Sequence, residues 1–354
     1  MLHLIISFIL LINSFVFAEK LYVVERERSA LAVIENGEFK KEIKNIGNAT
    51  HTTVKTDENF AYAVSRDGYM SKIDKRKDTL IKKVKAGNSG IGFTILKNYI
   101  VVADYDPKDV VVIDKKNMEI IKKINTDSRN VGIKHKKNLI VFSLMDKDQI
   151  WILDKNKDFN PVKKYENVGQ MPFDALLYKN IYIAGFFKES SLGVLNLDTF
   201  RYSKKTLNFK RKKEAVMKVP HFGTWGIIGN IGLIPSVGER EAVIFNFKKF
   251  KIDGYINLIG LPVFISVSPN KKFAAVNYSG DKQDYITIID LKTLKPIKNI
   301  KIGRRVMHLR FSKDSKKLYV TSYYDHKLKI LKTDNWKVKK EITVPTPSGI
   351  FIID

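Results

Sequence analysis

Residues 60–74, FAYAVSRDGYMSKID, decide the fold. They contain an apolar run of β-branched and aromatic residues, a polar turn with a glycine, and a second alternating run that ends in Asp. Alternation of period 2 on both sides of a turn is typical of a β-hairpin. The closing phrase, an apolar pair followed by Asp or a similar residue, recurs at Glu35, Asp74, Asp114, Asp154, Asn196, Asn246, Asp290 and Lys332.

The spacing of these eight positions predicts the architecture. The intervals are 39, 40, 40, 42, 50, 44 and 42 residues. A period of about 40 to 45 residues is that of a four-stranded propeller blade, and the sequence shows no sustained helical period. We therefore predict an all-β, eight-bladed β-propeller that occupies residues 19–354 as one domain.

The two ends of this domain predict how the ring closes. The first repeat begins at residues 20–24 without a preceding strand, and the last repeat ends with a surplus strand at residues 349–353. An unpaired strand edge is a liability that ring folds remove by pairing. We therefore expect the propeller to be closed by pairing the C-terminal strand into the first blade.

Composition excludes several kinds of chemistry. The chain of 354 residues has no cysteine, which excludes disulfides, thiolate catalysis, Cys-ligated zinc, iron–sulfur clusters and covalently attached haem c. The net charge of +26 comes from Lys and Arg residues scattered over turns and strand ends. That distribution indicates a solvated basic surface and no nucleic-acid partner. Imidazole chemistry is limited to His3, His51, His135, His221, His308 and His326.

Residues 1–18 are predicted to form a secretory signal peptide. They contain the apolar run LIISFILLINSFVF and end with Val16 and Ala18 at the −3 and −1 positions of a small-residue cleavage site. The alternative is an N-terminal anchor, but the run is shorter than the roughly 20 apolar residues that a bilayer core needs. We expect the remaining chain to lie outside the cytoplasm.

Loops on one face of the predicted propeller carry the candidate functional residues. The connections between the second and third strands bring Arg66, Asp67, Tyr105 and Arg240 to this face, and the fifth interval contains an insertion that carries His221. Such loops on a rigid scaffold are where function is expected. Counting 16 residues on from the repeat positions gives a ring about the axis, namely His51, Gly90, Asn130, Gln170, Pro262, Val306 and Ser348.

His51 and His221 are the candidate catalytic residues, and His51 is the candidate metal ligand. A neutral imidazole binds a metal or moves a proton near pH 7. The structural alternatives are a loop histidine bonded to a carbonyl for His51 and a turn-capping histidine for His221. His135 is expected to be exposed at a turn. For His308, in a strand, core packing is at least as good an interpretation as function.

The same face predicts an anionic ligand. Arginines such as Arg66 and Arg240 can clamp carboxylates with paired N–H donors, although a surface ion pair is the alternative for each. Imidazole, arginine and aromatic rings around an axial hollow suit a flat anionic macrocycle such as a haem. Motifs of hydrolases and of nucleotide-binding loops are missing from the sequence.

Several phrases of the sequence resemble those of a known family. They are SRDGYMSKID at 65–74, AGNSG at 86–90, GQMPFDALL at 169–177, IYIAGFF at 181–187, KVPHFGTW at 218–225, LIPSVG at 233–238, LPVF at 261–264 and PSGIF at 347–351. In this order they resemble the NirF family of periplasmic haem d1 biosynthesis proteins. That family is itself similar to the d1 domain of cytochrome cd1 nitrite reductase.

The resemblance implies that the central hollow binds haem d1 or its precursor dihydro-haem d1, in the periplasm, during a late step in the maturation of nitrite reductase. Whether the chain catalyses that step stays open. A CxxCH motif is missing, so no covalent haem c and no independent nitrite reduction are expected. Thr50 departs from the family, where a serine is expected. The resemblance implies His51, Arg66, Asp67, Asp174 and His221 as cofactor-binding residues. The loops of the same face add Asn88, Tyr105 and Arg240 as further candidates.

Two other functions remain open at this point. One is a non-catalytic carrier that hands haem d1 to cytochrome cd1 nitrite reductase, with other haem d1 assembly proteins as further partners and a homodimer as a possible assembly. The other is an interaction propeller of the YVTN type without a haem ligand, which residues 318–322, LYVTS, suggest.

Overall fold

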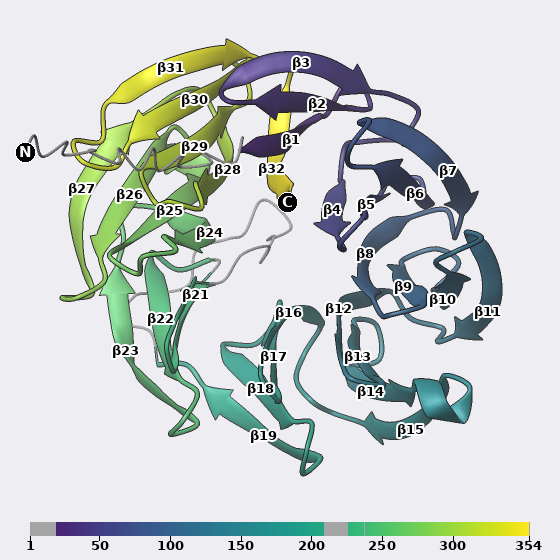
Figure 1. The fold of residues 1–354 in the computed structure, drawn as a ribbon. Helices are drawn as coiled ribbons and strands as arrows, with labels where there is room; N and C mark the ends of the chain where they lie inside the picture. The colour runs from purple at the N-terminus through teal and green to yellow at the C-terminus, as the bar shows by residue number, and fades with distance from the viewer. Residues whose placement is uncertain (1–18, 209–225, 237, 354) are drawn as a thin grey trace, which may run out of the picture.

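The computed structural model describes residues 19–208, 226–236 and 238–353. These residues form eight antiparallel four-stranded sheets, which are arranged as blades around a central axis (Figure 1). The prediction of an all-β, eight-bladed propeller is therefore confirmed. The predicted signal peptide and His221 lie outside the described residues. In the part of the chain that is described, no helix has the length and apolar character to cross a bilayer.

Each blade runs outward from the axis through four strands. The innermost strands are β32 (Pro347–Ile353), β4 (Thr53–Thr56), β8 (Gly90–Ile95), β12 (Asn130–Lys136), β16 (Pro172–Tyr178), β20 (Gly226–Ile228), β24 (Leu261–Val267) and β28 (Val306–Phe311). The second strands are β1 (Lys20–Glu25), β5 (Phe60–Val64), β9 (Tyr99–Asp104), β13 (Leu139–Leu144), β17 (Ile181–Phe186), β21 (Ile231–Ser236), β25 (Phe273–Ser279) and β29 (Lys317–Ser322).

The outer half of each blade completes the sheet. The third strands are β2 (Ala30–Glu35), β6 (Tyr69–Asp74), β10 (Asp109–Asp114), β14 (Gln149–Asp154), β18 (Ser191–Asn196), β22 (Glu241–Asn246), β26 (Tyr285–Asp290) and β30 (Lys327–Lys332). The outermost strands are β3 (Glu38–Ile43), β7 (Thr79–Lys85), β11 (Glu119–Asn125), β15 (Asn160–Tyr165), β19 (Arg201–Thr206), β23 (Lys251–Asn257), β27 (Lys295–Lys301) and β31 (Val338–Thr343). Two 3₁₀ turns are η1 (Lys155–Lys157) and η2 (Gly280–Lys282).

The recurring Asp or Asn of the sequence repeat ends the third strand of its blade. Asp74 Oδ1 accepts hydrogen bonds from the backbone N–H groups of Arg76 and Lys77, at 2.8 and 3.0 Å. Asn196 does the same for the turn after β18. Short Asx side chains stabilise a turn by bonding to the backbone two or three residues on. The repeat is thus the signature of the turn into the outermost strand.

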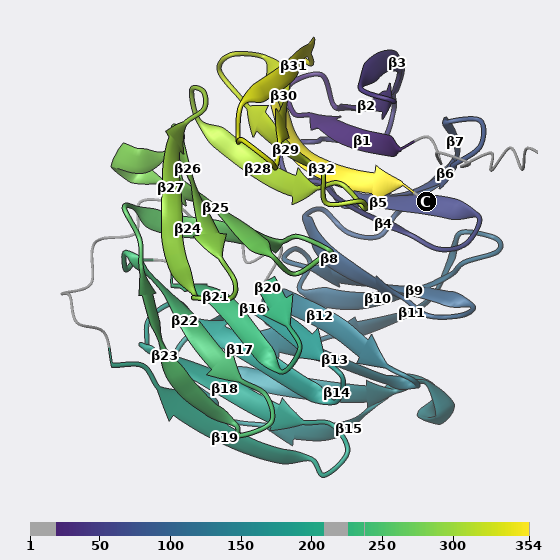
Figure 2. The ribbon, with the colours of Figure 1, turned by 60° about the vertical axis from the view of Figure 1, so that its left-hand side comes forward.

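The ring closes as predicted. Strand β32 pairs antiparallel with β1, so that Ile353 lies opposite Lys20 and Ile350 lies opposite Val23. The two views show β32 beside β1 at the inner edge of a blade whose other strands come from the N-terminal end (Figures 1 and 2). The first blade therefore contains both ends of the described chain.

The apolar core consists of layers between neighbouring blades. Between the blades of β1 and β5, for example, Tyr22, Val24 and Leu31 pack against Val54 and Ala61, all of them buried. Equivalent layers of buried residues join each blade to the next around the ring. Burial of this kind supplies most of the folding free energy. The innermost strands are consequently held rigidly around the axis.

Candidate functional site

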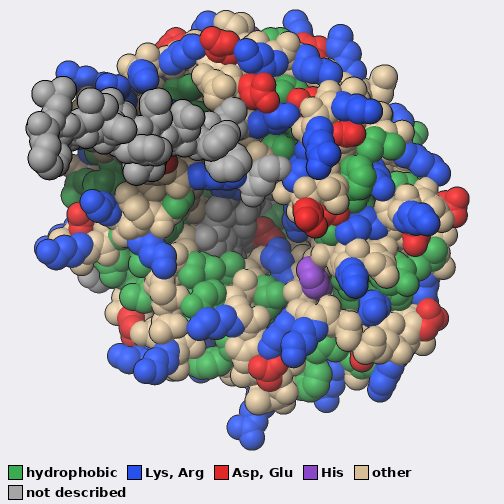
Figure 3. Space-filling model, in the orientation of Figure 1, with side chains coloured by type: hydrophobic (Ala, Val, Ile, Leu, Met, Phe, Trp, Pro, Cys, Tyr) green, Lys and Arg blue, Asp and Glu red, His purple; other side chains and the backbone are tan. Residues whose placement is uncertain are grey.

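A cavity of about 290 Å³ lies among the innermost strands. Seven of them contribute side chains or backbone to its wall, as does the loop before β4. The space-filling view shows a central hollow bordered by basic side chains and by a histidine (Figure 3). The residues around the cavity are Arg26, Thr50, His51, Thr52, Thr53, Lys55, Ile91, Gly92, Phe93, Val131, Gly132, Ile133, Lys134, Phe173, Asp174, Ala175, Leu176, Phe264, Met307, His308, Arg310, Ser348, Gly349 and Phe351.

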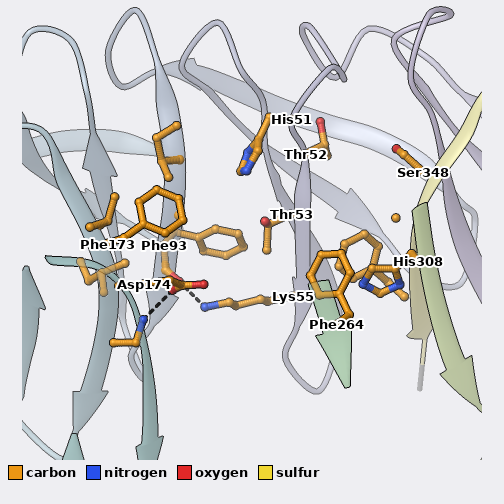
Figure 4. Close-up of a pocket in the computed structure, with 18 of the residues that line it drawn as sticks. His51, Thr52, Thr53, Lys55, Phe93, Phe173, Asp174, Phe264, His308 and Ser348 are labelled. Carbon is orange, nitrogen blue, oxygen red and sulfur yellow. Dashed lines mark hydrogen bonds between the residues drawn. The ribbon is translucent and has the colours of Figure 1, made fainter. Parts of the chain in front are cut away.

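His51 lies in the loop that leads into β4, half-buried, and its ring points into the cavity (Figure 4). The loop has a fixed shape. Gly47 adopts φ +91°, and a Cβ atom there would collide with Ser65 and Asp67, so that only glycine fits. The adjacent hydroxyl of Thr52 also lines the cavity, is buried, and has no hydrogen-bond partner among the described residues. A buried hydroxyl of this kind favours a polar ligand group beside it.

Asp67, which the sequence places among the cofactor ligands, holds the His51 loop from outside the cavity. Its Oδ1 accepts hydrogen bonds from Asn48 N at 2.8 Å and from Ser65 Oγ at 2.6 Å. Burial alone would raise the pKa of Asp67, but these hydrogen bonds outweigh it and lower the pKa below its usual value. Asp67 therefore acts on His51 through the loop.

The same arrangement recurs around the ring. In other blades a carboxylate at the end of the second strand accepts a hydrogen bond from the backbone N–H of the loop that enters an innermost strand. The examples are Asp146 with Arg129 N at 2.9 Å, Glu189 with Gln170 N at 3.1 Å, and Asp325 with Arg304 N at 3.0 Å. Because the same contact is found where no residue of the pair lines the cavity, we interpret it as part of the structure of the blade.

Replacing Asp67 by Ala is expected to destabilise the fold by about 1–3 kcal/mol, because the buried hydroxyl of Ser65 and the backbone N–H of Asn48 lose their charged acceptor. The midpoint of thermal unfolding should fall by several degrees. Asp325→Ala is the matched control, since it removes the same kind of contact from another blade. Only Asp67→Ala should also broaden the NMR signals of the His51 ring. Identical His51 signals in both variants would show that Asp67 does not position the histidine.

The deeper part of the cavity is basic. The side chains of Lys55, Lys134 and Arg310 line it from β4, β12 and β28. Arg26, which follows β1, also lines the cavity, at the end where the innermost strands begin. Asp174 on β16 is the acidic side chain in the wall, and its Oδ1 accepts a hydrogen bond from Ala175 N at 2.7 Å. Four basic residues against one acid create a positive potential that attracts anions.

The cations of the cavity are held in a desolvated setting. Lys55 Nζ donates a hydrogen bond to the carbonyl of Phe93 and lies 5.0 Å from the centre of the Phe93 ring. Burial and, after it, the charge of Lys134 lower the pKa of Lys55 to about 7, and the charge of Asp174 opposes this shift. Burial also lowers the pKa of Arg310 to about 10. An anion placed beside them would stabilise their charged forms.

Aromatic rings complete the wall and extend it to the rim. Phe93, Phe173 and Phe264 line the cavity, and Phe264 packs edge-on against His308 with 4.8 Å between ring centres. Phe173 also belongs to an apolar cluster that includes Tyr105. Flat apolar surfaces of this kind bind flat ligands, while a few polar groups fix their orientation.

The predicted rim residues fall into two groups. Arg66 lies over the Tyr105 ring, with 5.7 Å between its guanidinium carbon and the ring centre, beside the aromatic end of the cavity. Neither of these two residues lines the cavity, and neither do Asn88 and Arg240, which are bonded elsewhere. Asn88 Nδ2 bonds to Asp106 at 3.0 Å. Arg240 Nη1 donates to the carbonyl of Ile259 at 2.8 Å and pairs with Asp281.

Two further histidines differ in their surroundings. His135, expected to be exposed, is half-buried in β12, where its Nδ1 lies 2.6 Å from Thr94 Oγ1. The expected turn is strand, since β12 extends to Lys136. His308 is 7% exposed, and its Nδ1 accepts a hydrogen bond from Ile350 N at 3.3 Å. It is thus packed in the core and also lines the cavity, so both interpretations of this histidine stay open. Among the described residues, no three His, Asp or Glu side chains gather to hold a metal ion.

Comparison with known proteins identifies the family. Residues 18–354, which are nearly the whole chain, match the cytochrome d1 haem domain family. The chain belongs to the cytochrome d1 haem domain family. The resemblance to NirF drawn from short phrases is confirmed at the level of the whole sequence, as distant homology.

Two relatives of the chain are NirF proteins. NirF of Stutzerimonas stutzeri is 27% identical over 351 residues, which cover 93% of this chain and 90% of that protein. NirF of Pseudomonas aeruginosa is also 27% identical, over 87% of this chain and 84% of that protein. The relatives are therefore matched over nearly their full length.

Solved structures share the fold. The dihydro-haem d1 dehydrogenase NirN, in complex with DHE, superposes with a TM-score of 0.80 at 18% identity, over 94% of this chain and 74% of that one. AztD of Citrobacter koseri superposes with a TM-score of 0.70 at 14% identity, over 95% and 98% of the two chains. At these identities the likeness shows a shared propeller.

Proposed function

We propose that this chain is a periplasmic haem d1 biosynthesis protein that binds haem d1 or dihydro-haem d1 in the central cavity. The observation that carries the proposal is the composition of the cavity wall: His51 at the mouth, four phenylalanine rings, and four basic side chains against one acid. A tetrapyrrole of this class combines a flat macrocycle, an iron and several carboxylates. Each of these parts has a matching group in the wall.

Membership of the cytochrome d1 haem domain family and distant homology to NirF support the same ligand class. NirN, which has the same fold, is a dihydro-haem d1 dehydrogenase, and this supports dihydro-haem d1 as a candidate ligand here. When bound, the tetrapyrrole supplies the iron. This chain's own residues orient it: His51 faces the mouth, the Phe rings hold the macrocycle, and the basic floor holds the carboxylates.

A cavity-filling substitution tests the proposal. Gly92 lies on β8 with an ordinary backbone conformation, and a Cβ there would contact only Ile133, at 3.8 Å. Gly92→Trp therefore fills the cavity without backbone strain. Iron protoporphyrin IX should bind the wild-type protein with a shifted absorption band, and Gly92→Trp should weaken this binding about 100-fold, which is about 2.7 kcal/mol.

Ile121→Trp is the matched control for the cavity-filling variant. Ile121 lies on β11 of the same blade and is 51% exposed, so this tryptophan enlarges the outer surface and leaves the cavity open. It should bind the porphyrin as the wild-type protein does. If both tryptophan variants bind equally well, the ligand lies elsewhere and the proposal fails.

A further inference from the structure

Lys55 has a place in the cavity that the sequence motifs did not single out. We propose that Lys55 binds a carboxylate of the tetrapyrrole and takes up a proton as this ligand enters, so that it selects ligands with free carboxylates. The inference rests on the proposed function and names how the same cavity recognises its ligand. It makes Lys55 a specificity-determining residue of the cavity floor.

The geometry places the ammonium group where an anion would reach it. Thr53 and Lys55 alternate along β4, whose pairing with β5 is regular, and they lie below His51 on the cavity wall (Figure 4). An ammonium carries three N–H donors. Its hydrogen-bond partner among the described residues is the carbonyl of Phe93. Two donors therefore remain for a ligand.

Charged groups on the surrounding strands set the charge of Lys55. Lys134 on β12 and Asp174 on β16 act on it in opposite directions. Burial lowers the pKa of His135 on β12, and the charge of Lys55 lowers it further. Arg310 and His308 face the same cavity from β28, and Arg26 from the end of β1. The site is rich in cations, which disfavours a charged lysine until an anion arrives.

The direction of the pH effect follows from this balance. The pKa of Lys55 is about 7 in the free protein, so the amine is largely neutral at pH 8. A carboxylate beside it favours the charged form and raises its pKa. Binding at pH 8 therefore takes up to about one proton from solution. Affinity should be full below pH 7 and should fall as the pH rises above 7.

Calorimetry with iron protoporphyrin IX and with its dimethyl ester tests the proposal. Titrations at pH 8 in two buffers of different ionisation enthalpy measure the protons taken up. The wild-type protein should bind the free acid about tenfold or more tightly than the ester, the range for a charge-assisted hydrogen bond. Lys55→Met should lose both this preference and the proton uptake. Lys55→Arg should keep the preference but lose the uptake, because its guanidinium stays charged.

Lys72→Met is the matched control. Lys72 also donates to a backbone carbonyl, that of Lys115, at 3.0 Å. It lies 4.3 Å from the centre of the Phe60 ring, and burial lowers its pKa, but it does not line the cavity. This variant should bind both porphyrins like the wild-type protein. Lys72→Met thus separates the role of Lys55 from the general effect of removing a buried lysine.

The outcomes separate the role of Lys55 from the proposed function. If neither porphyrin binds the wild-type protein, the proposed function and the inference both fail. Suppose that both porphyrins bind the wild-type protein and that Gly92→Trp blocks their binding. If Lys55→Met then still prefers the free acid, or still takes up a proton, only the inference about Lys55 is overturned. Proton uptake that persists in Lys55→Arg would likewise assign the proton to another group.

Discussion

Deletion of residues 347–354 is expected to lower the midpoint of thermal unfolding by at least about 10 °C. It removes β32, and with it the backbone hydrogen bonds to β1. It also removes Ile350 and Ile353, which are 0% and 5% exposed and belong to the apolar layers on both sides of the first blade. Loss of these two side chains alone costs about 3–6 kcal/mol, a large part of the 5–15 kcal/mol that stabilises a typical domain. Calorimetry measures the shift.

A rearranged chain provides the control for this deletion. Because Ile353 lies directly opposite Lys20, a two-residue Asn-Gly turn can join them as a hairpin. A circular permutant with this turn and new ends between β31 and β32 contains the same strands in a new order. It should recover most of the lost stability. A deleted chain that keeps its full unfolding midpoint and stays monomeric would contradict closure by the C-terminal strand.

His51→Ala is expected to abolish cofactor maturation while leaving the fold and most of the ligand affinity intact. The imidazole lies at the mouth of the cavity, whereas the apolar and aromatic wall provides most of the contact surface. We expect the affinity for haem d1 to fall by no more than about tenfold, and the absorption band to shift if the imidazole binds iron. Nitrite reductase activity in a complemented deletion strain measures maturation, and a titration measures affinity.

His135→Asn is the matched control for His51. His135 is also a half-buried histidine, but it is not part of the cavity wall. This variant should support normal maturation. Normal maturation by His51→Ala, with an unchanged ligand spectrum, would make His51 a structural residue. His221→Ala then becomes the next histidine to test, and maturation without either imidazole would favour a carrier over an enzyme.

The fold could be predicted from the sequence because its cause is local and repeated. In six of the eight blades an Asp or Asn at the end of the third strand bonds to the following turn, so the turn chemistry of the blade recurs in the sequence about every 40 residues. The surplus C-terminal strand was equally visible, because a ring fold must pair its edges. The repeated turn depends on residues that are close together in the chain. The closure depends on the pairing of one surplus strand.

The cavity could be predicted only in part, because the inner strands are irregular. Counting from the repeats correctly located the starts of inner strands, such as Gly90 and Asn130. Beyond those starts, register shifts in β8, β12, β16, β24 and β28 change which side chains face the axis. Alternation therefore could not identify Lys134, which follows such a bulge. In β4, which is regular, the same alternation would have found Lys55 from Thr53.

The charged rim residues show a second limit of sequence reasoning. Asp67 and Arg240 carry the chemistry of ligand-binding residues, yet each has a partner within the protein: Asp67 holds the loop at Asn48, and Arg240 pairs with Asp281. Residue type does not reveal such partners, since they come from segments far apart in the chain. By contrast, Asp174 and His51, both predicted, do line the cavity.

A crystal structure of the protein with bound haem d1, with data collected at the iron absorption edge, tests the central claim most directly. We predict one strong anomalous peak inside the cavity on the side of His51, with the carboxylates of the ligand toward Lys55 and Arg310. An iron peak on the outer surface of the blades, with the central cavity filled only by solvent, would contradict a tetrapyrrole site on the propeller axis.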